Sequence, residues 1–231
     1  EASAARAVFL AAGAEGNPDI IDWDHHTIVG TCQQLEKRYL RLTSAPNPAT
    51  VRPLPVLRKT LAFLEQKWRE EGNYVYICNQ FKSLRQDLTV QRIKNDLTMS
   101  VYETHARIAL ERADLGEYNQ CQSQLKALYA RLRHIAQPAA VDEFTAYRLL
   151  YLVHTRNTSG MPPLASAPAA PAIGPMVQFA LAVRHAVAIG DYHAFFRLYA
   201  LAPKMAPYLM DHMLERERLR AAVALVRASR P

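Results

Sequence analysis

The chain has 231 residues, of which 50% are hydrophobic, and a formal net charge of +7 at pH 7. This length is enough for a continuous core, and no apolar run approaches the roughly 18 residues that a membrane span requires. Its three cysteines, Cys32, Cys78 and Cys121, are isolated and odd in number, which argues against a zinc site or a disulfide framework and fits a reducing compartment. The positive charge is compatible with an anionic partner but carries no information about the fold.

The N-terminal part of the chain predicts two helices and two loops. Residues 2–14 are rich in alanine and predict a short helix rather than a secretory signal, and residues 17–26 predict a loop. Apolar residues recur at helical spacing in residues 27–43, which predicts a second helix. Residues 45–55 hold four prolines. They predict an extended connection, because proline disrupts helix interiors.

The stretch 72–96 gives the clearest helical pattern, and the rest of the chain is expected to be arranged around it. Its apolar stripe consists of Ile77, Phe81, Leu84 and Leu88. Arg85 and Arg92 lie at one edge of this stripe and Asp87 lies at the other. An arginine in that position usually packs its stem on the core and offers its guanidinium to a carboxylate, so we assign Arg85 and Arg92 mainly to structure.

Seven further segments show helical patterns, and no segment alternates for long enough to indicate a strand. The helical segments are 56–71, 97–114, 117–134, 140–157, 176–189, 192–201 and 204–229, the last of which forms one or two helices. The stretch 158–175 is rich in proline, alanine and serine and predicts a flexible insertion. We therefore divide the chain into an N-terminal helix and loop (1–26), a first helical part (27–157), the insertion (158–175) and a C-terminal helical part (176–231).

Three turns between predicted helices share one pattern, in which a glycine precedes a tyrosine by two positions. The pairs are Gly72 with Tyr74, Gly116 with Tyr118, and Gly190 with Tyr192. The glycine is expected to stop one helix, the residue after it favours the start of the next, and the tyrosine can pack between the two. Helical pairs that recur in this way are typical of an α-solenoid of TPR type, although an irregular helical bundle remains an alternative.

Several stretches resemble the Sac/GANP family of PCI-type proteins. They are FKSLRQDLTVQ (81–91), LEKRYLRLTSAPNPATVRPLPVL (35–57), LGEYNQCQSQLKALY (115–129), FTAYRLLYL (144–152) and GDYHAFFRLYALAP (190–203). The resemblance implies a TPR-like helical array that leads into a winged-helix subdomain, with residues 215–229 as a candidate first element of that subdomain. It also implies a scaffold that joins a second PCI-domain protein and a small, very acidic Sem-type subunit in nuclear mRNA processing and export.

The sequence offers little that indicates catalysis, a metal or a cofactor. The recognisable hydrolase, zinc-protease and nucleotide-binding patterns are missing. Four loop residues could ligate a metal, namely Asp22, Asp24, His25 and His26, but adjacent residues rarely share one ion and helix caps explain them better. His105, near Glu103, is better explained as a half-buried structural histidine than as a general base. Tyr74, Tyr76 and Tyr118 could stack on bases, but tyrosines at helix turns usually pack.

Two basic clusters are the better functional lead. Lys37, Arg38 and Arg41 fall on the solvent face of the predicted helix 27–43. Arg216, Arg220 and Arg227 lie within about 40° of one another on the last predicted helix, at 100° per residue. Such faces can present several cations to a phosphate backbone, although a simple solvated charged face is the alternative.

These observations favour a non-catalytic nuclear scaffold that binds protein partners and contacts RNA or DNA through its basic faces. The second hypothesis is a purely protein-binding PCI scaffold, like those of the proteasome lid, whose positive charge answers an acidic subunit. A hydrolase that lacks a recognised motif is the third. The three scattered thiols fit the cytosol or the nucleus, and the resemblance implies a nuclear protein, with an additional presence in the cytoplasm as an open alternative.

Overall fold

The computed structural model describes residues 27–157, 160 and 174–229. The predicted helix at 2–14, the predicted loop at 17–26 and nearly all of the predicted insertion lie outside these residues. Of the predicted insertion, Gly160, Gly174 and Pro175 are described, and the last two form the N-cap and the first residue of a helix.

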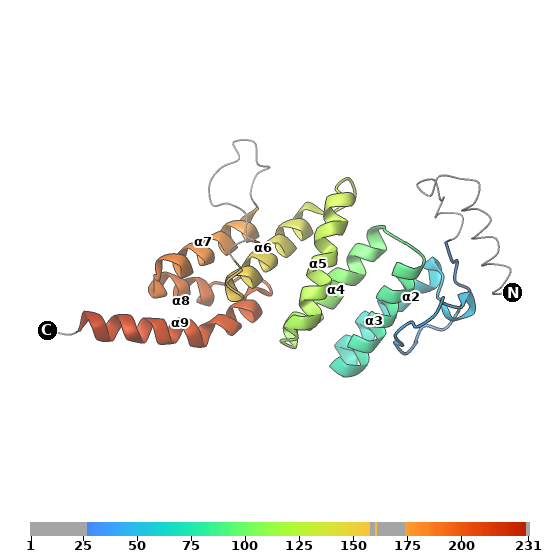
Figure 1. The fold of residues 1–231 in the computed structure, drawn as a ribbon, viewed down its shortest axis with the longest axis horizontal. Coiled ribbons are helices and arrows are strands. Elements are labelled where there is room, and N and C mark those ends of the chain that lie inside the picture. The colour runs from blue at the N-terminus through green and yellow to red at the C-terminus, as the bar shows by residue number, and fades with distance from the viewer. Residues whose placement is uncertain (1–26, 158–159, 161–173, 230–231) are drawn as a thin grey trace.

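The described residues form eight α-helices and one short 3-10 turn, with no strand among them, so the predicted all-α fold is confirmed. The elements are η2 (Pro48–Thr50), α2 (Leu54–Glu71), α3 (Tyr74–Val90), α4 (Asp96–Glu111), α5 (Leu115–Arg131), α6 (Pro138–His154), α7 (Pro175–Ile189), α8 (Tyr192–Ala200) and α9 (Ala206–Ala228). Figure 1 shows α2 to α7 following one another along the long axis of the molecule. In this part of the chain the last element is the single helix α9, so the winged helix stays a prediction.

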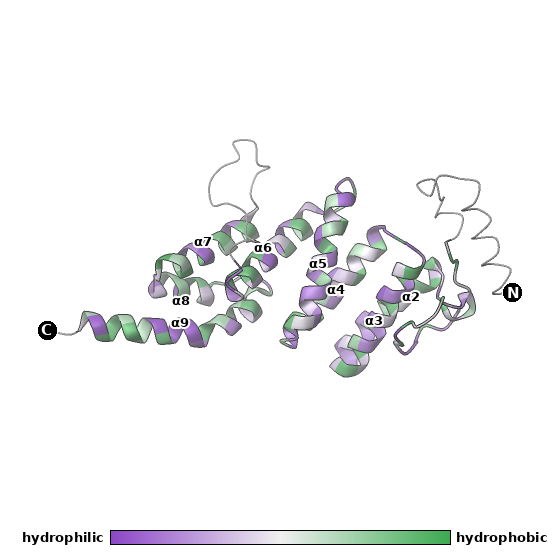
Figure 2. Cartoon of the chain, in the orientation of Figure 1, coloured by the Kyte–Doolittle hydropathy of each residue, from purple (hydrophilic) through white to green (hydrophobic). Residues whose placement is uncertain are grey.

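Helices that follow one another in the sequence pack side by side, and α9 also returns to α6 and α4. This is the arrangement of a helical-repeat array, in which each unit contacts mainly its neighbours. Hydrophobic and hydrophilic residues are interspersed along every helix (Figure 2), as expected where one face of each helix is buried. No helix among the described residues is both long and apolar enough to cross a membrane.

The interior consists of two apolar clusters that share one helix. The first cluster joins α2, α3 and α4 and includes the stripe of α3, of which Phe81 and Leu84 have no exposed surface. The second joins α4 to α9 around Tyr118, Tyr147 and Phe195. Because α4 contributes residues to both clusters, it connects the N-terminal and C-terminal halves of the array.

The turn before α3 follows its prediction, but α3 is shorter than its pattern suggests. Gly72 ends α2 with a φ of 60°, in the left-handed region that favours glycine, and Asn73 caps α3 by accepting a hydrogen bond from the amide of Tyr76 at 3.2 Å. At the other end, Arg92 takes a φ of 53° and the Ile93 amide bonds to the Leu88 carbonyl at 2.9 Å. This closure ends α3 at Val90, before the break predicted at Asn95.

The predicted role of Gly116 as a helix stop is wrong. Gly116 lies inside the first turn of α5, whose N-cap is Asp114. The left-handed residue of this turn is Ala113, with a φ of 56°, and the Asp114 amide closes the turn on the Ala109 carbonyl at 2.9 Å. Gly190, with a φ of 77°, fills its predicted place before Asp191 and Tyr192. Two of the three turns therefore share the predicted geometry, and the middle one uses residues three positions earlier.

The predicted helix at 27–43 is also wrong. Residues 27–53, which we call the strap, are extended apart from the turn η2, and they lie across α2 and α3. Side chains of Leu35, Lys37 and Tyr39 face inward, and the residues between them face solvent. A spacing of four residues, as between Leu35 and Tyr39, places two side chains on one face in both a helix and an extended chain. Only in an extended chain does Lys37, midway between them, face inward as well. Lys37, Arg38 and Arg41 therefore do not share a helical face.

We predict that Ala113→Gly stabilises the protein. A side chain at positive φ costs about 1 kcal/mol that glycine avoids, and Ala113 is exposed, so no packing is lost. The free energy of unfolding, measured by urea denaturation, should rise by about that amount. Ala127→Gly is the control, because Ala127 is an exposed residue in the interior of α5, where glycine costs about 1 kcal/mol. Equal losses in both variants would contradict the geometry of this turn.

Candidate binding surfaces and the buried networks beneath them

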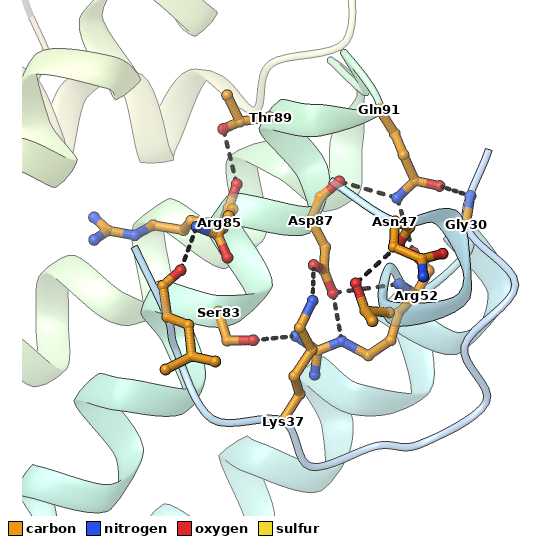
Figure 3. A network of polar contacts seen from close by, with 12 residues as sticks. Gly30, Lys37, Asn47, Arg52, Ser83, Arg85, Asp87, Thr89 and Gln91 are labelled. Atoms are coloured by element: carbon orange, nitrogen blue, oxygen red, sulfur yellow. Dashed lines mark hydrogen bonds and ion pairs between the residues drawn. The ribbon is translucent and has the colours of Figure 1, made fainter. Parts of the chain in front are cut away.

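One carboxylate holds the strap to α3. Asp87 is on α3, and its side chain is 1% exposed. One oxygen accepts from the Arg52 Nε at 2.7 Å and the other from the Lys37 Nζ at 2.6 Å (Figure 3). Arg52 has no exposed surface, so its charge depends on Asp87 for compensation.

The remaining donors of Arg52 are also satisfied. Its Nη2 donates to the Ser83 hydroxyl at 2.9 Å and its Nη1 to the Leu35 carbonyl at 2.7 Å. Because Leu35 belongs to an earlier part of the strap, Arg52 joins both ends of the strap to each other and to α3. A buried ion pair with these extra hydrogen bonds specifies one arrangement of the chain.

Three glutamines of α3 and its C-cap bind the backbone of the strap. Gln80 accepts from the Lys37 amide at 2.9 Å, and Gln86 donates to the Leu40 carbonyl at 2.9 Å. Gln91 does both, accepting from the Gly30 amide at 3.0 Å and donating to the Arg52 carbonyl at 2.8 Å. Extended chain that is not part of a sheet needs partners for its polar groups, and these amides supply them.

Gly30 can occupy its place only because it lacks a side chain. A Cβ atom there would lie 2.2 Å from the Val51 carbonyl oxygen, closer than any real contact. The two arms of the strap meet at this point, where the Cys32 amide donates to the Val51 carbonyl at 2.9 Å. The strap is therefore a closed, packed element rather than a loose extension.

A second buried network joins α3 to α5 on the other side of α3. Arg85 and Asp87 are two residues apart, about 200° around the helix, so they point in opposite directions. Arg85 forms an ion pair with Glu117 of α5 and donates to the Cys121 thiol at 3.0 Å. Lys82 binds the second oxygen of Glu117 at 3.0 Å. Through Asp87 on one side and Arg85 on the other, α3 links the strap to α5.

The same region contains three residues that could in principle ligate a metal. His105, Glu117 and Cys121 offer ligand atoms that all lie within 4.8 Å of one another. However, Arg85 and Lys82 already neutralise the carboxylate. Burial raises the pKa of the Cys121 thiol to about 12, so the thiolate that a metal would need is disfavoured. We interpret the cluster as structural. The metal ligands considered in residues 22–26 lie outside the described residues.

His105 is a neutral core residue and not a general base. Its ring stacks on Phe81 with the centroids 5.0 Å apart, and neither ring nitrogen has a hydrogen-bond partner in the described part of the chain. Burial lowers the pKa of His105 well below its ordinary value, and the positive charges of Arg85 and Lys82 lower it further.

The tyrosines of the turns pack or donate hydrogen bonds. The Tyr74 hydroxyl donates to the Asp114 carboxylate at 2.6 Å, which joins the turn before α3 to the turn before α5. Tyr118 has no exposed surface, and Tyr192, the first residue of α8, is partly buried. Tyr118 is therefore unavailable for stacking on a base, and Tyr74 has a structural role.

The first basic cluster is only partly available to a ligand. Lys37 is bound to Asp87 and its side chain is 21% exposed, whereas Arg38 and Arg41 are exposed on the outer side of the strap. Among the six predicted cations, Arg38 and Arg41 therefore remain on the surface as expected, but on an extended segment.

In the second cluster, one buried acid binds two of the three arginines. Glu217 of α9 is 3% exposed and pairs with the Arg216 Nε at 2.7 Å and with the Arg220 Nη1 at 3.2 Å. Arg216 also donates to the His154 carbonyl at 3.1 Å, which ties α9 to the end of α6. Arg227 lies exposed near the end of α9.

The C-terminal half of α9 extends past α7 and α8 (Figure 1) and leaves an apolar stripe uncovered. Leu219, Val223 and Val226 are spaced as one face of the helix, and their exposed fractions are 68%, 42% and 58%. Single exposed apolar residues are ordinary, but three in one stripe on a projecting helix form a candidate contact surface.

The residues that matter most for the networks were not recognised from the sequence. The sequence predicts Arg52 only as part of a proline-rich connection and Glu117 only as a residue that favours a helix start. An arginine between Val51 and Pro53, in a stretch that resembles the family, is the signal that could have indicated Arg52. The pairing partner of Glu117 is 32 residues away, so periodicity could not reveal it.

We predict that Asp87→Asn lowers the free energy of unfolding by about 3–5 kcal/mol, because it leaves the buried Arg52 charge without a counterion. Asp96→Asn is the control. Asp96 pairs with Arg58 in an exposed bridge, with side chains 60% and 50% exposed, and its loss should cost less than about 1 kcal/mol. Urea denaturation of both variants measures the difference, and similar losses would contradict the proposed role of Asp87.

We also predict that His105 makes the protein less stable as the pH falls. Its pKa is lowered in the folded state, so only the unfolded chain takes up the proton below its ordinary pKa of about 6.5. Between pH 6.5 and 5.5 the wild type should lose about 1 kcal/mol more than His105→Leu. His134→Gln, a substitution at an exposed histidine, is the matched control. Identical pH profiles for wild type and His105→Leu would show that His105 is not buried as a neutral ring.

Comparisons with known proteins agree with the resemblance. A model of the SAC3/GANP family matches residues 32–229. The chain is 55% identical over 209 residues to a THP3 homolog of Schizosaccharomyces pombe, which covers 90% of this chain and 52% of that protein. It is 49% identical over 214 residues to a leukocyte receptor cluster member 8 homolog of Xenopus laevis, covering 92% of this chain and 26% of that protein.

A plant relative is also similar. SAC3 family protein A of Arabidopsis thaliana is 50% identical over 229 residues, covering 97% of this chain and 22% of that protein. The chain thus spans about half or less of the length of these curated relatives. Because the family model covers most of the chain, and its fold is the all-helical array implied by the resemblance, this chain belongs to the SAC3/GANP family.

Proposed function

We propose that this chain is the helical-repeat part of a non-catalytic nuclear scaffold in mRNA processing or export. Its support is membership of the SAC3/GANP family together with relatives that are named THP3 and SAC3 proteins. The polar clusters agree with this proposal, since the acids of both buried networks are bound to internal cations. Such networks hold helices in place rather than act on a substrate.

The single observation that carries the scaffold proposal is the uncovered stripe of α9. A projecting helix with an apolar stripe and arginines around it is suited to a protein partner, because removing apolar surface from water favours association. We assign this surface to a second PCI-domain protein. The small acidic Sem-type subunit implied by the family is the further proposed partner.

Contact with RNA or DNA is the second part of the proposal. The exposed Arg38 and Arg41 of the strap and the exposed Arg227 of α9 are candidates, and Lys37, Arg216 and Arg220 could contribute only while bound to acids. Binding that depends on such cations would tolerate many sequences and weaken strongly with salt.

A specific observation favours the alternative, a scaffold that binds proteins alone. Half of the predicted basic residues, namely Lys37, Arg216 and Arg220, are engaged in internal ion pairs. In this alternative the basic residues of the chain stabilise the fold through ion pairs and bind an acidic protein partner.

We predict that the double variant Leu219→Asp and Val223→Asp loses the partner. Tagged full-length protein, purified from nuclear extract and measured by quantitative mass spectrometry, should recover at least about tenfold less PCI-domain protein, because the variant puts charge into an apolar contact. Val75→Asp is the matched control, since Val75 is 72% exposed in the first turn of α3, where an acid is tolerated.

Unchanged recovery of the PCI-domain protein would contradict the assignment of this surface. So would a large fall in the melting temperature of the double variant alone, because that result would show that the stripe is covered by the protein's own chain.

A further inference from the structure

A groove runs along α3 and α5 on the side of α3 that faces α5. It consists of two cavities of about 490 Å³ and 770 Å³, which share Thr89, Tyr102 and Gln124 as lining residues and are therefore adjacent. α3 and α5 run in the same direction, separated in the sequence by α4, and Tyr102 of α4 lies between them. The strap forms part of one rim through Tyr39 and Leu42.

The charged side chains that line this groove are all positive. Neither cavity has an aspartate or glutamate among its described lining residues, whereas five cations line them: Lys82, Arg85, Arg92, Lys94 and Arg131. Lys82 and Arg85 are partly neutralised by Glu117 beneath the surface. Lys94 and Arg131 are exposed and belong to no salt bridge in the described part of the chain, so the cations without an acidic partner lie at the end where α3 and α5 terminate.

Between the cations, the groove offers groups that both donate and accept hydrogen bonds. Gln86 and Thr89 of α3 face Asn119, Ser123 and Gln124 of α5 across it. Amides and hydroxyls of this kind contact phosphate and sugar oxygens as well as base edges. The groove also has exposed or partly exposed apolar side chains, namely Leu42, Val90 and Ile93, and the partly exposed ring of Tyr39 offers a surface on which a base can stack.

The cavities also indicate which form of nucleic acid fits. A flexible single strand can place separate nucleotides in adjacent cavities of this size, whereas a duplex offers mainly the outside of its two backbones. We propose that the groove between α3 and α5 binds the sugar–phosphate backbone of single-stranded nucleic acid. This inference rests on the proposed contact with RNA or DNA and assigns it to residues outside both basic clusters predicted from the sequence.

The test compares two double variants of the full-length protein that change the charge equally. Lys94→Glu with Arg131→Glu reverses the free cations of the groove, and Lys59→Glu with Arg69→Glu reverses two exposed cations of α2. The probe is a fluorescein-labelled oligouridylate of about 20 nucleotides, long enough to span the groove. Fluorescence anisotropy is measured at several salt concentrations, with melting temperatures of all variants as the control for folding.

The groove variant should bind at least about tenfold more weakly at low salt. The slope of its salt dependence should fall by about 1.4, because each phosphate that the protein no longer neutralises lowers that slope by about 0.7. The α2 variant should change affinity less than about threefold. Gln124→Glu, which adds a carboxylate of the same shape where the two cavities meet, should weaken binding by about 3–10-fold without loss of stability.

Four results would overturn the inference. Equal losses in the two double variants would show that only net charge matters. Binding could also be lost when Arg38, Arg41 and Arg227 are changed to Glu and retained when Lys94 and Arg131 are changed. That result would exclude the groove as the binding site and leave the proposed contact with nucleic acid in place. Competition by an equal concentration of polyglutamate would assign the groove to an acidic protein. If no variant of the protein binds the probe, the nucleic-acid part of the proposed function fails with it.

Discussion

The position of the strap depends on one buried carboxylate. Asp87 compensates Arg52, which is fully buried, and holds Lys37 at the edge of the same network. Without Asp87 the buried charge of Arg52 would lack a counterion. The proline-rich segment that carries Arg52 would then lose its anchor on α3. The glutamines of α3 complete the attachment through the backbone of the strap. An extended segment of this kind is thereby built into the helical array, in which α2 is the first α-helix of the described residues.

Helix α3 contacts the strap on one side and α5 on the other, and this arrangement determines which surfaces of α3 are exposed. Asp87 points to the strap and Arg85 to Glu117, so the two sides of α3 are fixed by opposite charges. The groove opens where the strap and α5 flank α3, and the cations at its far end sit at the ends of α3 and α5, where helix dipoles also favour them. The uncovered stripe of α9 lies at the opposite end of the array (Figure 1). The surface proposed for a nucleic acid and the surface proposed for a protein therefore lie apart on the chain.

Local patterns predicted the helices well and the contacts between distant residues poorly. The stripe from Ile77 to Leu88 is regular and buried, and Gly72 and Gly190 have the positive φ that their turns require. The prediction for Gly116 is wrong because Ala113 adopts the left-handed conformation in its place. The prediction for the strap is wrong because the spacing of Leu35 and Tyr39 fits both a helix and an extended chain. The partners of Arg52 and Glu117 come from separate elements, and nothing in their own neighbourhood of the sequence indicates them. The groove could not be predicted at all, since its two walls are brought together only by the packing of α4 between them.

Amide hydrogen exchange, followed by mass spectrometry on wild type and Asp87→Asn, tests the central claim most directly. If Asp87 anchors the strap, peptides from residues 30–52 should lose their protection in the variant, while peptides from α6 and α7, which make no contact with the strap network, should exchange as in the wild type. Unchanged protection of residues 30–52, or an equal loss of protection in α6 and α7, would contradict the claim that this carboxylate is what fixes the strap.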